Sequence, residues 1–480
     1  MKSFGVVFCA AVLGSAGCAV GPDFHRPATP DDRSYTPEPL SKTAVADGKA
    51  QQFIEGQGIA ANWWHFLGCP ALDAIVARAI AANPGIDVAR MTLRKNQDSL
   101  RAGYGVFFPQ VDARAGVSRQ RLNQPPFPSS TFNLFSLSGT VSYTLDIWGG
   151  ARRQAEVLVA AVEAQRFTLA GTYVMLSSNV VDAVIAQAAY RDEVDATKAT
   201  LALLKEQVRI TKAQAMGGTV PYSNVLSLQS QVASTEATLP PLEEKIDQAS
   251  DLLAALSGMT PANWRQPALA LADLHVPEDL PLSLPSALVR QRSDVLIAEA
   301  ELHSANASIG VATAEMLPNL TLSADLGANN TALGDLFSAR SPFWSIGAGL
   351  TQPIFHGGAL YYQRKAAIDA RDAAAAEYRQ TVLGAFQQVA DALRGLSHDA
   401  DAVAAQTEAV ETAERAMRLI QANYQAGIGT YLQVLIADGQ YLQSKVGYVQ
   451  AVAQRLQDTV ALYVALGGGW WNTPAAFTDR

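Results

Sequence analysis

The sequence predicts a mainly α-helical chain with a small β part, built as two similar halves. Each half has two stretches in which apolar and polar residues alternate, and one long stretch without proline. Landmark residues recur about 210 positions apart: Pro109 and Pro318, Gly149 and Gly357, Gly218 and Gly429, Leu256 and Leu466. A repeat of this length is typical of an internal duplication, because solenoid repeats are only about 20–50 residues long.

The composition excludes two classes of protein. The 480 residues carry a formal net charge of -8 and a pI near 5.4, so we expect no nucleic-acid partner. No stretch contains the run of about 18 apolar residues that a membrane-spanning helix needs. Any membrane crossing is therefore expected to use strands, because only helices and closed barrels satisfy their backbone groups within lipid.

The N-terminus predicts a secreted lipoprotein. A basic residue and a short apolar run over 4–13 are typical of a secretory signal peptide, here residues 1–17. The following Leu-Gly-Ser-Ala-Gly-Cys resembles a bacterial lipobox, in which cleavage occurs just before the cysteine that receives lipid. We expect Cys18 to be acylated at the first residue of the mature chain. The alternative is ordinary cleavage near Ala16, which would leave that thiol unmodified.

The first half is expected to begin after an extended segment. Residues 18–60 are rich in Pro, Asp and Ser and are expected to lie extended along the body. The first repeat, 61–258, starts with a helical pattern over 71–104 that is interrupted at Asn83-Pro84. Pro109 then ends the helix and opens the first strand.

Apolar and polar residues alternate with a period of two in four stretches, which predicts four strands. They lie near 111–118, 136–147, 319–326 and 344–351, and their lengths suit the ~9–11 residues of a tilted membrane strand. One such strand could equally belong to a half-buried sheet in a soluble protein, whereas four favour lipid outside and water inside. Aromatic residues near the strand ends are candidates for the membrane interface: Phe108, Trp148, Phe343, Trp344 and Phe355.

Acidic side chains occupy polar positions of the predicted strands. Asp112, Asp146 and Asp325 are expected to face the lumen, where they would favour cations, although Arg114 lies on the same face as Asp112. Four strands cannot close a barrel, and open edges are not tolerated in lipid. A dimer would give a barrel of about eight strands that fills its own interior, so three copies and twelve strands are favoured.

Two long helices are predicted over the proline-free stretches 151–215 and 359–426. At 1.5 Å per residue each would span roughly 100 Å, and the apolar spacing is typical of a coiled coil. The helices predicted beside them are about half as long, so that pairs of short helices could stack against a long one in the wall of a helical barrel: 71–104, 221–256, 285–315 and 431–466.

Glycine turns separate the long helices from the short ones and are expected to form the tips of helix hairpins. Thr219 and Thr430 are predicted to cap the helices that follow, with Pro221 in a first turn. The predicted tip residues are Gly217, Gly218, Thr219, Gly427, Gly429 and Thr430. The remaining segments are a proline-rich linker at 259–285, the second repeat at 286–469 and a tail at 470–480.

Six motifs lie in order along the chain: 18–27 (CAVGPDFHRP), 145–150 (LDIWGG), 292–299 (RSDVLIAE), 309–318 (IGVATAEMLP), 424–435 (YQAGIGTYLQVL) and 465–470 (ALGGGW). Together they resemble the outer-membrane efflux channel lipoproteins of the TolC type, in the OprM/NodT branch. The resemblance implies a homotrimeric duct with a twelve-stranded barrel in the bacterial outer membrane and a helical coiled-coil tunnel in the periplasm, anchored by palmitate-type lipid.

The resemblance also implies a function and partners. The duct would passively conduct drugs or other small toxic compounds, and its partners would be a periplasmic adaptor and an inner-membrane pump of the RND class. One alternative is an outer-membrane channel for type I protein secretion. The other alternative, from a different class, is a structural coiled-coil lipoprotein of the envelope.

No residues point to catalysis, a metal or a cofactor. The six histidines lack metal-ligand spacing, and Gly427-x-Gly429 lacks the strand and third glycine of a dinucleotide loop. The expected functional residues are instead a periplasmic constriction. Leu432 and Ile436 share a helix face and could close the duct by dewetting, or could pack in a coiled-coil core. The family often has Asp four residues after its Leu, but here Asp438 lies two residues further, so the ring could be acidic or hydrophobic.

Overall fold

The computed structural model describes residues 19–38, 40–46, 50–123, 125–126, 128–265, 269–338 and 340–472. The predicted signal peptide and Cys18 lie outside the described residues. The chain forms two compact units, and each draws on both halves of the sequence. The sheet unit contains the described parts of Met1–Pro27, Thr92–Gln165 and Ile297–Arg379; the helical unit contains those of Ala28–Met91, Arg166–Leu296 and Gln380–Arg480.

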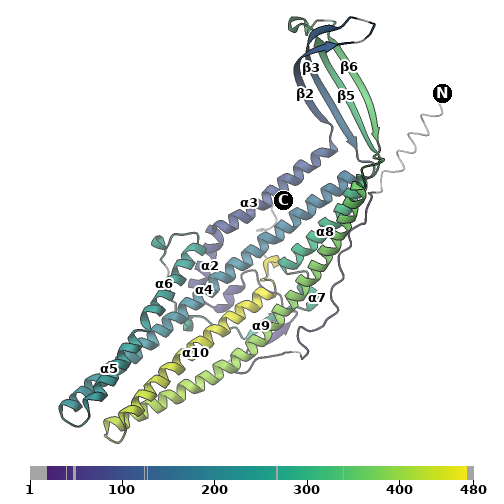
Figure 1. The fold of residues 1–480 in the computed structure, drawn as a ribbon. Helices are drawn as coiled ribbons and strands as arrows, with labels where there is room; N and C mark the ends of the chain where they lie inside the picture. The colour runs from purple at the N-terminus through teal and green to yellow at the C-terminus, as the bar shows by residue number, and fades with distance from the viewer. Residues whose placement is uncertain are drawn as a thin grey trace. The chain divides into compact units, whose positions relative to one another are not determined.

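One antiparallel sheet of four strands dominates the sheet unit (Figure 1). Its strands are β2 (Gln110–Leu122), β3 (Ser130–Leu145), β5 (Asn319–Asn330) and β6 (Pro342–Thr351). The order β2-β3-β5-β6 pairs a strand of the first half with one of the second half at the centre of the sheet. The predicted strands are confirmed, and β2 and β6 are the edges.

The pairing register places polar residues opposite one another across all four strands. Asp112 lies opposite Thr140, Thr140 opposite Asp325, and Asp325 opposite Ser345. Thr140 Oγ1 donates to Asp325 Oδ1 at 2.7 Å, and Ser345 Oγ donates to Asp325 Oδ2 at 3.2 Å. The other face of the sheet exposes large apolar side chains: Val111, Val117, Leu137, Val141, Leu322, Leu326, Trp344, Ile346 and Leu350.

Most of the chain is helical, as predicted. The two long helices are α4 (Gly150–Met216) and α9 (Ala359–Gln425), each of 67 residues. The shorter helices are α2 (Pro70–Ala82), α3 (Pro84–Gly103), α5 (Tyr222–Glu236), α6 (Leu239–Leu256), α7 (Pro285–Leu288), α8 (Ser293–Ala314) and α10 (Tyr431–Ala465). Single 3₁₀ turns are η1 (Trp63–Leu67), η2 (Tyr104–Phe107), η3 (Pro261–Asn263), η4 (Leu271–Asp273), η5 (Leu333–Asp335) and η6 (Trp470–Asn472).

Two predicted helices are each divided in the structure. The stretch 221–256 breaks between α5 and α6, because Pro240 and Pro241 fit only the first turn of a new helix. The stretch 285–315 breaks between α7 and α8, where the backbone turns at residues 289–291. Continuous helices were therefore the wrong prediction at both places.

The structure also contains a small sheet that the sequence analysis did not predict. Strand β1 (Gln52–Glu55) pairs in parallel with β4 (Asp279–Leu282) in the helical unit. Both strands are only 4 residues long, so alternation could not reveal them. Phe53 and Leu280 are buried, and the pair ties the extended N-terminal segment to the predicted linker.

One stretch of α4 is more apolar than the sequence analysis expected, since no stretch long and apolar enough to span a membrane was predicted. Among the described residues, α4 is the helix long and apolar enough to cross a membrane by composition. Of that apolar stretch, 61% is buried inside the chain, as in the core helix of a soluble protein. Its apolar character therefore reflects helix packing in the structure.

A buried arginine joins three helices of the helical unit. Arg292, just before α8, donates from Nη1 to the Ala465 carbonyl oxygen at 2.7 Å, at the end of α10. Its Nη2 donates to Asp294 Oδ2 at 2.6 Å and to Gln388 Oε1 of α9 at 2.8 Å. A guanidinium suits this position because its donors lie in a rigid fork.

We predict that Gly258→Ala lowers the free energy of unfolding by about 1–3 kcal/mol. Gly258 follows α6 with φ 68°, and an added Cβ would lie 2.2 Å from the Ala82 carbonyl oxygen at the end of α2. Thermal unfolding of the detergent-solubilised protein, followed by circular dichroism, measures the effect. Gly384→Ala in α9 is the control, because nothing lies within 4 Å of its added Cβ. Equal shifts for the two variants would contradict the prediction.

Candidate functional site

Two helix hairpins of the helical unit end in glycine turns. In the first, Gly218 has φ 75°, and both the N–H and the hydroxyl of Thr219 donate to the Gln214 carbonyl oxygen. In the second, Gly427 has φ 78°, and Ile428 N–H donates to the Asn423 carbonyl oxygen at 2.9 Å. A positive φ favours glycine, so these residues determine where each long helix ends.

The two hairpins begin their second helices differently. Thr430 precedes α10 as its N-cap, and its backbone N–H donates to Gln433 Oε1 at 2.8 Å. Thr219 does not cap α5, which contradicts the prediction; Pro221 holds that position. The hydroxyl of Thr219 instead satisfies a carbonyl oxygen at the end of α4.

The two apolar residues of the predicted constriction are exposed in the single chain. Leu432 is 60% exposed and Ile436 is 63% exposed, one turn apart on α10. Within this chain they therefore do not pack in a helix core. Matching Gly218 with Gly429 places Val225 at the position equivalent to Ile436, and Val225 is 0% exposed. The first hairpin nonetheless exposes an apolar pair of its own, Tyr222 at 59% and Leu226 at 54%, one turn apart on α5.

Asp438 lies on a different side of α10. It is only 3% exposed, and it accepts a hydrogen bond from Gln421 Nε2 of α9 at 2.8 Å. Burial raises the pKa of Asp438 to about 6, which Gln421 partly offsets. On α9, Tyr424 donates its hydroxyl to Gln214 Oε1 at 3.1 Å, so polar contacts connect α10, α9 and α4 near the tips. The tertiary contact brings Gln214 and Gln421 into this set, and no sequence motif marks them.

The three strand carboxylates do not share one environment. Asp112 and Asp325 lie in the polar row across the sheet. Asp146 is not a strand residue, which corrects the prediction, because β3 ends at Leu145. Its carboxylate caps α4 by accepting the backbone N–H groups of Ala151 at 2.9 Å and Arg152 at 3.0 Å. Negative charge at a helix N-terminus is stabilising.

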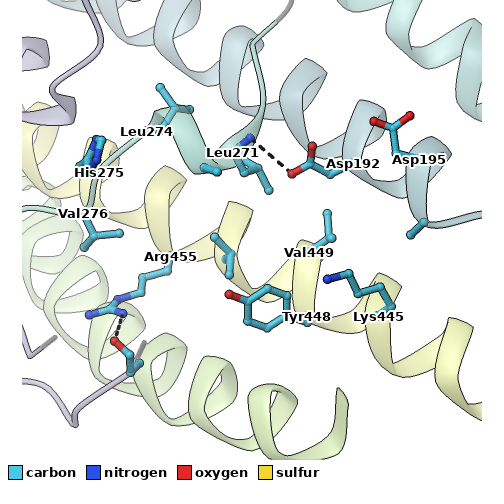
Figure 2. Close-up of a pocket in the computed structure, with 14 residues that line it drawn as sticks. Asp192, Asp195, Leu271, Leu274, His275, Val276, Lys445, Tyr448, Val449 and Arg455 are labelled. Carbon is cyan, nitrogen blue, oxygen red and sulfur yellow. Dashed lines mark hydrogen bonds between the residues drawn. The ribbon is translucent and has the colours of Figure 1, made fainter. Parts of the chain in front are cut away.

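A cavity of about 540 Å³ lies in the helical unit (Figure 2). It is lined by α4, the segment 271–276 and α10, with apolar walls and a few charged groups. Asp192 accepts the Leu271 N–H at 3.4 Å, and burial raises the pKa of that carboxyl. Lys445 lies over the Tyr448 ring. Within the described ranges no cluster of His, Cys, Asp and Glu could hold a metal ion.

A set of acidic groups in the helical unit escaped the sequence analysis. Asp182 of α4, Asp399 of α9 and Asp458 of α10 interact electrostatically. Burial raises the pKa of Asp182 to about 6, and burial together with a hydrogen bond to Asp458 raises the pKa of Asp399. These positions are far apart in sequence, so only helix packing brings them together.

Comparison with known proteins agrees with this geometry. The family described as outer membrane efflux protein matches residues 75–259 and 284–468. The pyoverdine export outer membrane protein OpmQ of Pseudomonas aeruginosa is 28% identical over 98% of this chain and 97% of its own length. The toluene efflux pump outer membrane protein TtgC of Pseudomonas putida is 28% identical over 96% and 94%. The solved outer-membrane channel OprN has a TM-score of 0.85 and 26% identity, with 94% and 100% covered.

We predict that Asp438→Asn removes a pH dependence of the α10 tip. The folded chain holds a proton on Asp438 up to about pH 6, against an ordinary pKa of 3.8. Raising the pH through that window therefore destabilises the folded tip, by up to about 3 kcal/mol. Hydrogen exchange of residues 431–445, compared between wild type and variant at the same pH, measures this.

The amide of the variant imitates the protonated acid at every pH. Below about pH 3.5, where Asp438 is protonated in both the folded and the unfolded chain, the two proteins should exchange alike, and at about pH 8 the variant should exchange more slowly. Glu411→Asn on α9, at an exposed position, is the control and should leave this difference unchanged. Faster exchange of Asp438→Asn at the higher pH would refute the prediction.

Proposed function

Because the chain belongs to the outer membrane efflux protein family, we propose that it is the passive exit duct of a tripartite efflux pump. It is an outer-membrane component of an efflux pump, so the family expected from the sequence motifs is confirmed. In the proposal, three copies form one duct, which passes small toxic compounds from a periplasmic adaptor and an inner-membrane pump to the exterior. The pump is proposed to be of the RND class.

The sheet is the observation that carries the proposal. One face exposes nine large apolar side chains, which lipid would cover, while the other carries the row of Asp112, Thr140, Asp325 and Ser345. The edge strands β2 and β6 leave backbone groups unpaired, and lipid offers them no hydrogen bonds. Edge-to-edge pairing of three copies would satisfy them and would enclose a polar lumen of twelve strands.

The substrate is proposed to be chosen by the pump. In the proposal, the sheet gives the duct an inner surface with a row of hydroxyl and carboxylate groups, which does not favour one compound. The relatives named for export of pyoverdine and for efflux of toluene support small molecules of unlike chemistry. These names favour small-compound efflux over the alternative of type I protein secretion.

The constriction is proposed to lie at the second hairpin. Leu432 and Ile436 point away from the helix core of their own chain, so threefold symmetry could bring three such pairs together. A ring of apolar side chains closes a pore by excluding water. Asp438 is turned into the α9–α10 contact, and this favours a hydrophobic ring over an acidic one.

The proposal also includes the location of the protein in the cell envelope. Residues 1–17 would be removed as a signal peptide, and Cys18 would carry the lipid anchor in the outer membrane. The repeats 61–258 and 286–469, with the linker between them, would then form the sheet and the helices of one protomer.

We predict that the purified protein runs as a trimer in native mass spectrometry from detergent. Reconstituted in a planar bilayer, it should conduct ions, because the enclosed lumen is polar. The structural-lipoprotein alternative predicts no conductance. A monomer that needs no detergent and shows no conductance would end the duct proposal.

We predict that Ile436→Ser raises single-channel conductance at least several-fold, because a hydroxyl wets a constriction that isoleucine keeps dry. Met216→Ser is the matched control, since Met216 is an exposed apolar residue at the tip of the first hairpin. It should leave conductance unchanged. Unaltered conductance in Ile436→Ser, with trimers intact, would reject the ring.

A further inference from the structure

The hairpin end of the four-stranded sheet carries an excess of positive charge. Strands β2 and β3 join at one hairpin and β5 and β6 at the other, and both hairpins lie at the same end of the sheet (Figure 1). Over 118–134 and 327–343 the sequence contains three basic residues, Arg119, Arg121 and Arg340, and one acidic residue, Asp335. All three arginines are exposed. This end is therefore positive in a chain whose formal net charge is -8.

Two of these arginines lie on the apolar face of the sheet. The pairing of β2 with β3 is one to one over the whole of β2, without a bulge. Because side chains along a strand point alternately to its two faces, Arg119 and Arg121 share the face of Val111 and Val117. Arg114 lies on the opposite face, together with the polar row that crosses the sheet. The two faces of β2 thus carry arginines with different surroundings.

The arginines of the apolar face lie directly beyond its apolar part. On β3 that part runs from Leu145 to Phe135, a separation of ten residues, which is about 34 Å along a strand. At the ~40° tilt of membrane strands this gives a height of about 26 Å, close to the ~25 Å apolar band of outer-membrane barrels. Arg119 pairs with Asn133, the next position of β3 on this face, and Arg121 lies two residues further out. Both arginines are therefore placed where the apolar band ends.

An arginine at this level reaches the headgroups of a bilayer. Its long apolar stem lies along hydrocarbon while the guanidinium extends into the polar layer. Arg121 Nη2 donates to Ser129 Oγ at 3.2 Å, which holds this guanidinium at the β2–β3 hairpin. Within the part of the chain that the structure describes, neither Arg119 nor Arg121 forms an ion pair with a carboxylate. Their charge is therefore available to an anion from outside the chain.

The proposed closure of three copies brings the third arginine to the same place. Arg340 lies two residues before β6, and edge-to-edge pairing would place β6 of one copy beside β2 of the next. Arg340 of one copy would then lie at the same rim as Arg119 and Arg121 of its neighbour. Like charges side by side are destabilising, whereas a phosphate accepts two N–H groups from one guanidinium. The seam between copies therefore favours a bound phosphate.

We propose that Arg119 and Arg121 form a phosphate-binding rim on the lipid-facing side of the sheet, which binds the phosphorylated headgroups of lipids in the outward-facing leaflet. This inference rests on the proposed function, in which the sheet spans the outer membrane with its hairpins outside. The position selects a lipid as the occupant, because the arginines adjoin the exposed apolar side chains of the same face. One phosphorylated lipid fits both parts of this surface, with its acyl chains on the apolar band and its phosphate on the guanidinium groups.

Binding of diphosphoryl lipid A to the full chain tests the proposal. The delipidated protein in a neutral detergent is titrated with this lipid, and native mass spectrometry counts the bound lipids per oligomer. The parent should retain diphosphoryl lipid A in preference to phosphatidylcholine, whose headgroup has no net charge. Arg119→Gln should weaken binding about fivefold, the size typical of one basic residue at an anionic lipid surface. Changing Arg121→Gln as well should weaken binding by about twenty-five-fold.

Arg114→Gln is the matched control, because it removes the same charge from the same strand on the opposite face. It should leave lipid binding unchanged. Equal losses in Arg114→Gln and Arg119→Gln would overturn the proposal, since binding would then follow the net charge and not the lipid-facing side. Arg119→Lys keeps the charge without the bidentate geometry, so its affinity should lie between those of the parent and Arg119→Gln. Because these side chains are exposed, each variant should migrate as the parent oligomer in lipid-free detergent.

Two further measurements identify the occupant and separate this inference from the duct. Inorganic phosphate at millimolar concentration should leave the bound lipid in place, and complete displacement would overturn the lipid as the occupant. Conductance of the parent in a planar bilayer of phosphatidylcholine alone tests the duct independently of any anionic lipid. A parent that does not conduct would end the duct proposal. A conducting parent that shows no preference for diphosphoryl lipid A would overturn the phosphate-binding rim alone.

Discussion

The unpaired edges of the four-stranded sheet are the constraint on which the rest of the structure depends. Strands β2 and β6 are the edges of the sheet, each with one row of backbone groups that pairs with no other strand among the described residues, while one face of the sheet is apolar. Water could satisfy such edges, but lipid cannot. The proposed closed assembly would satisfy these edges, and the family to which the chain belongs is that of outer membrane efflux proteins.

Buried arginines connect parts of the chain that the duplication separates. In the helical unit, Arg292 joins the start of α8 to the end of α10 and to α9. In the sheet unit, Arg153 of α4 pairs with Asp23 of the extended N-terminal segment. A guanidinium offers five donors in one plane, so one side chain can satisfy several carbonyl and carboxylate oxygens at once. At both places an extended segment meets a helix, and backbone oxygens there need hydrogen-bond donors. The buried arginine supplies these donors in place of apolar packing.

The two halves have similar elements but different surfaces. Ile436 on α10 has a buried counterpart, Val225, on α5, where Tyr222 and Leu226 are exposed instead. The predicted single helix over 221–256 is broken by prolines, whereas α10 runs unbroken over 35 residues. The two hairpins therefore expose different apolar residues, on second helices that differ in continuity.

Local patterns in the sequence alone predicted most of the strands, long helices and turns of this protein. Alternation identified the four strands, the absence of proline identified α4 and α9, and glycines marked the hairpin turns, because these signals depend on neighbours in the chain. Alternation did not show that β3 ends before Asp146, since a carboxylate one residue further serves α4 as a cap. The pairing of β1 with β4, the burial of Asp438 and the ion pair of Arg153 with Asp23 were decided only by tertiary structure. Each joins residues far apart in sequence, and the energy of burial and ion pairing exists only once those segments meet.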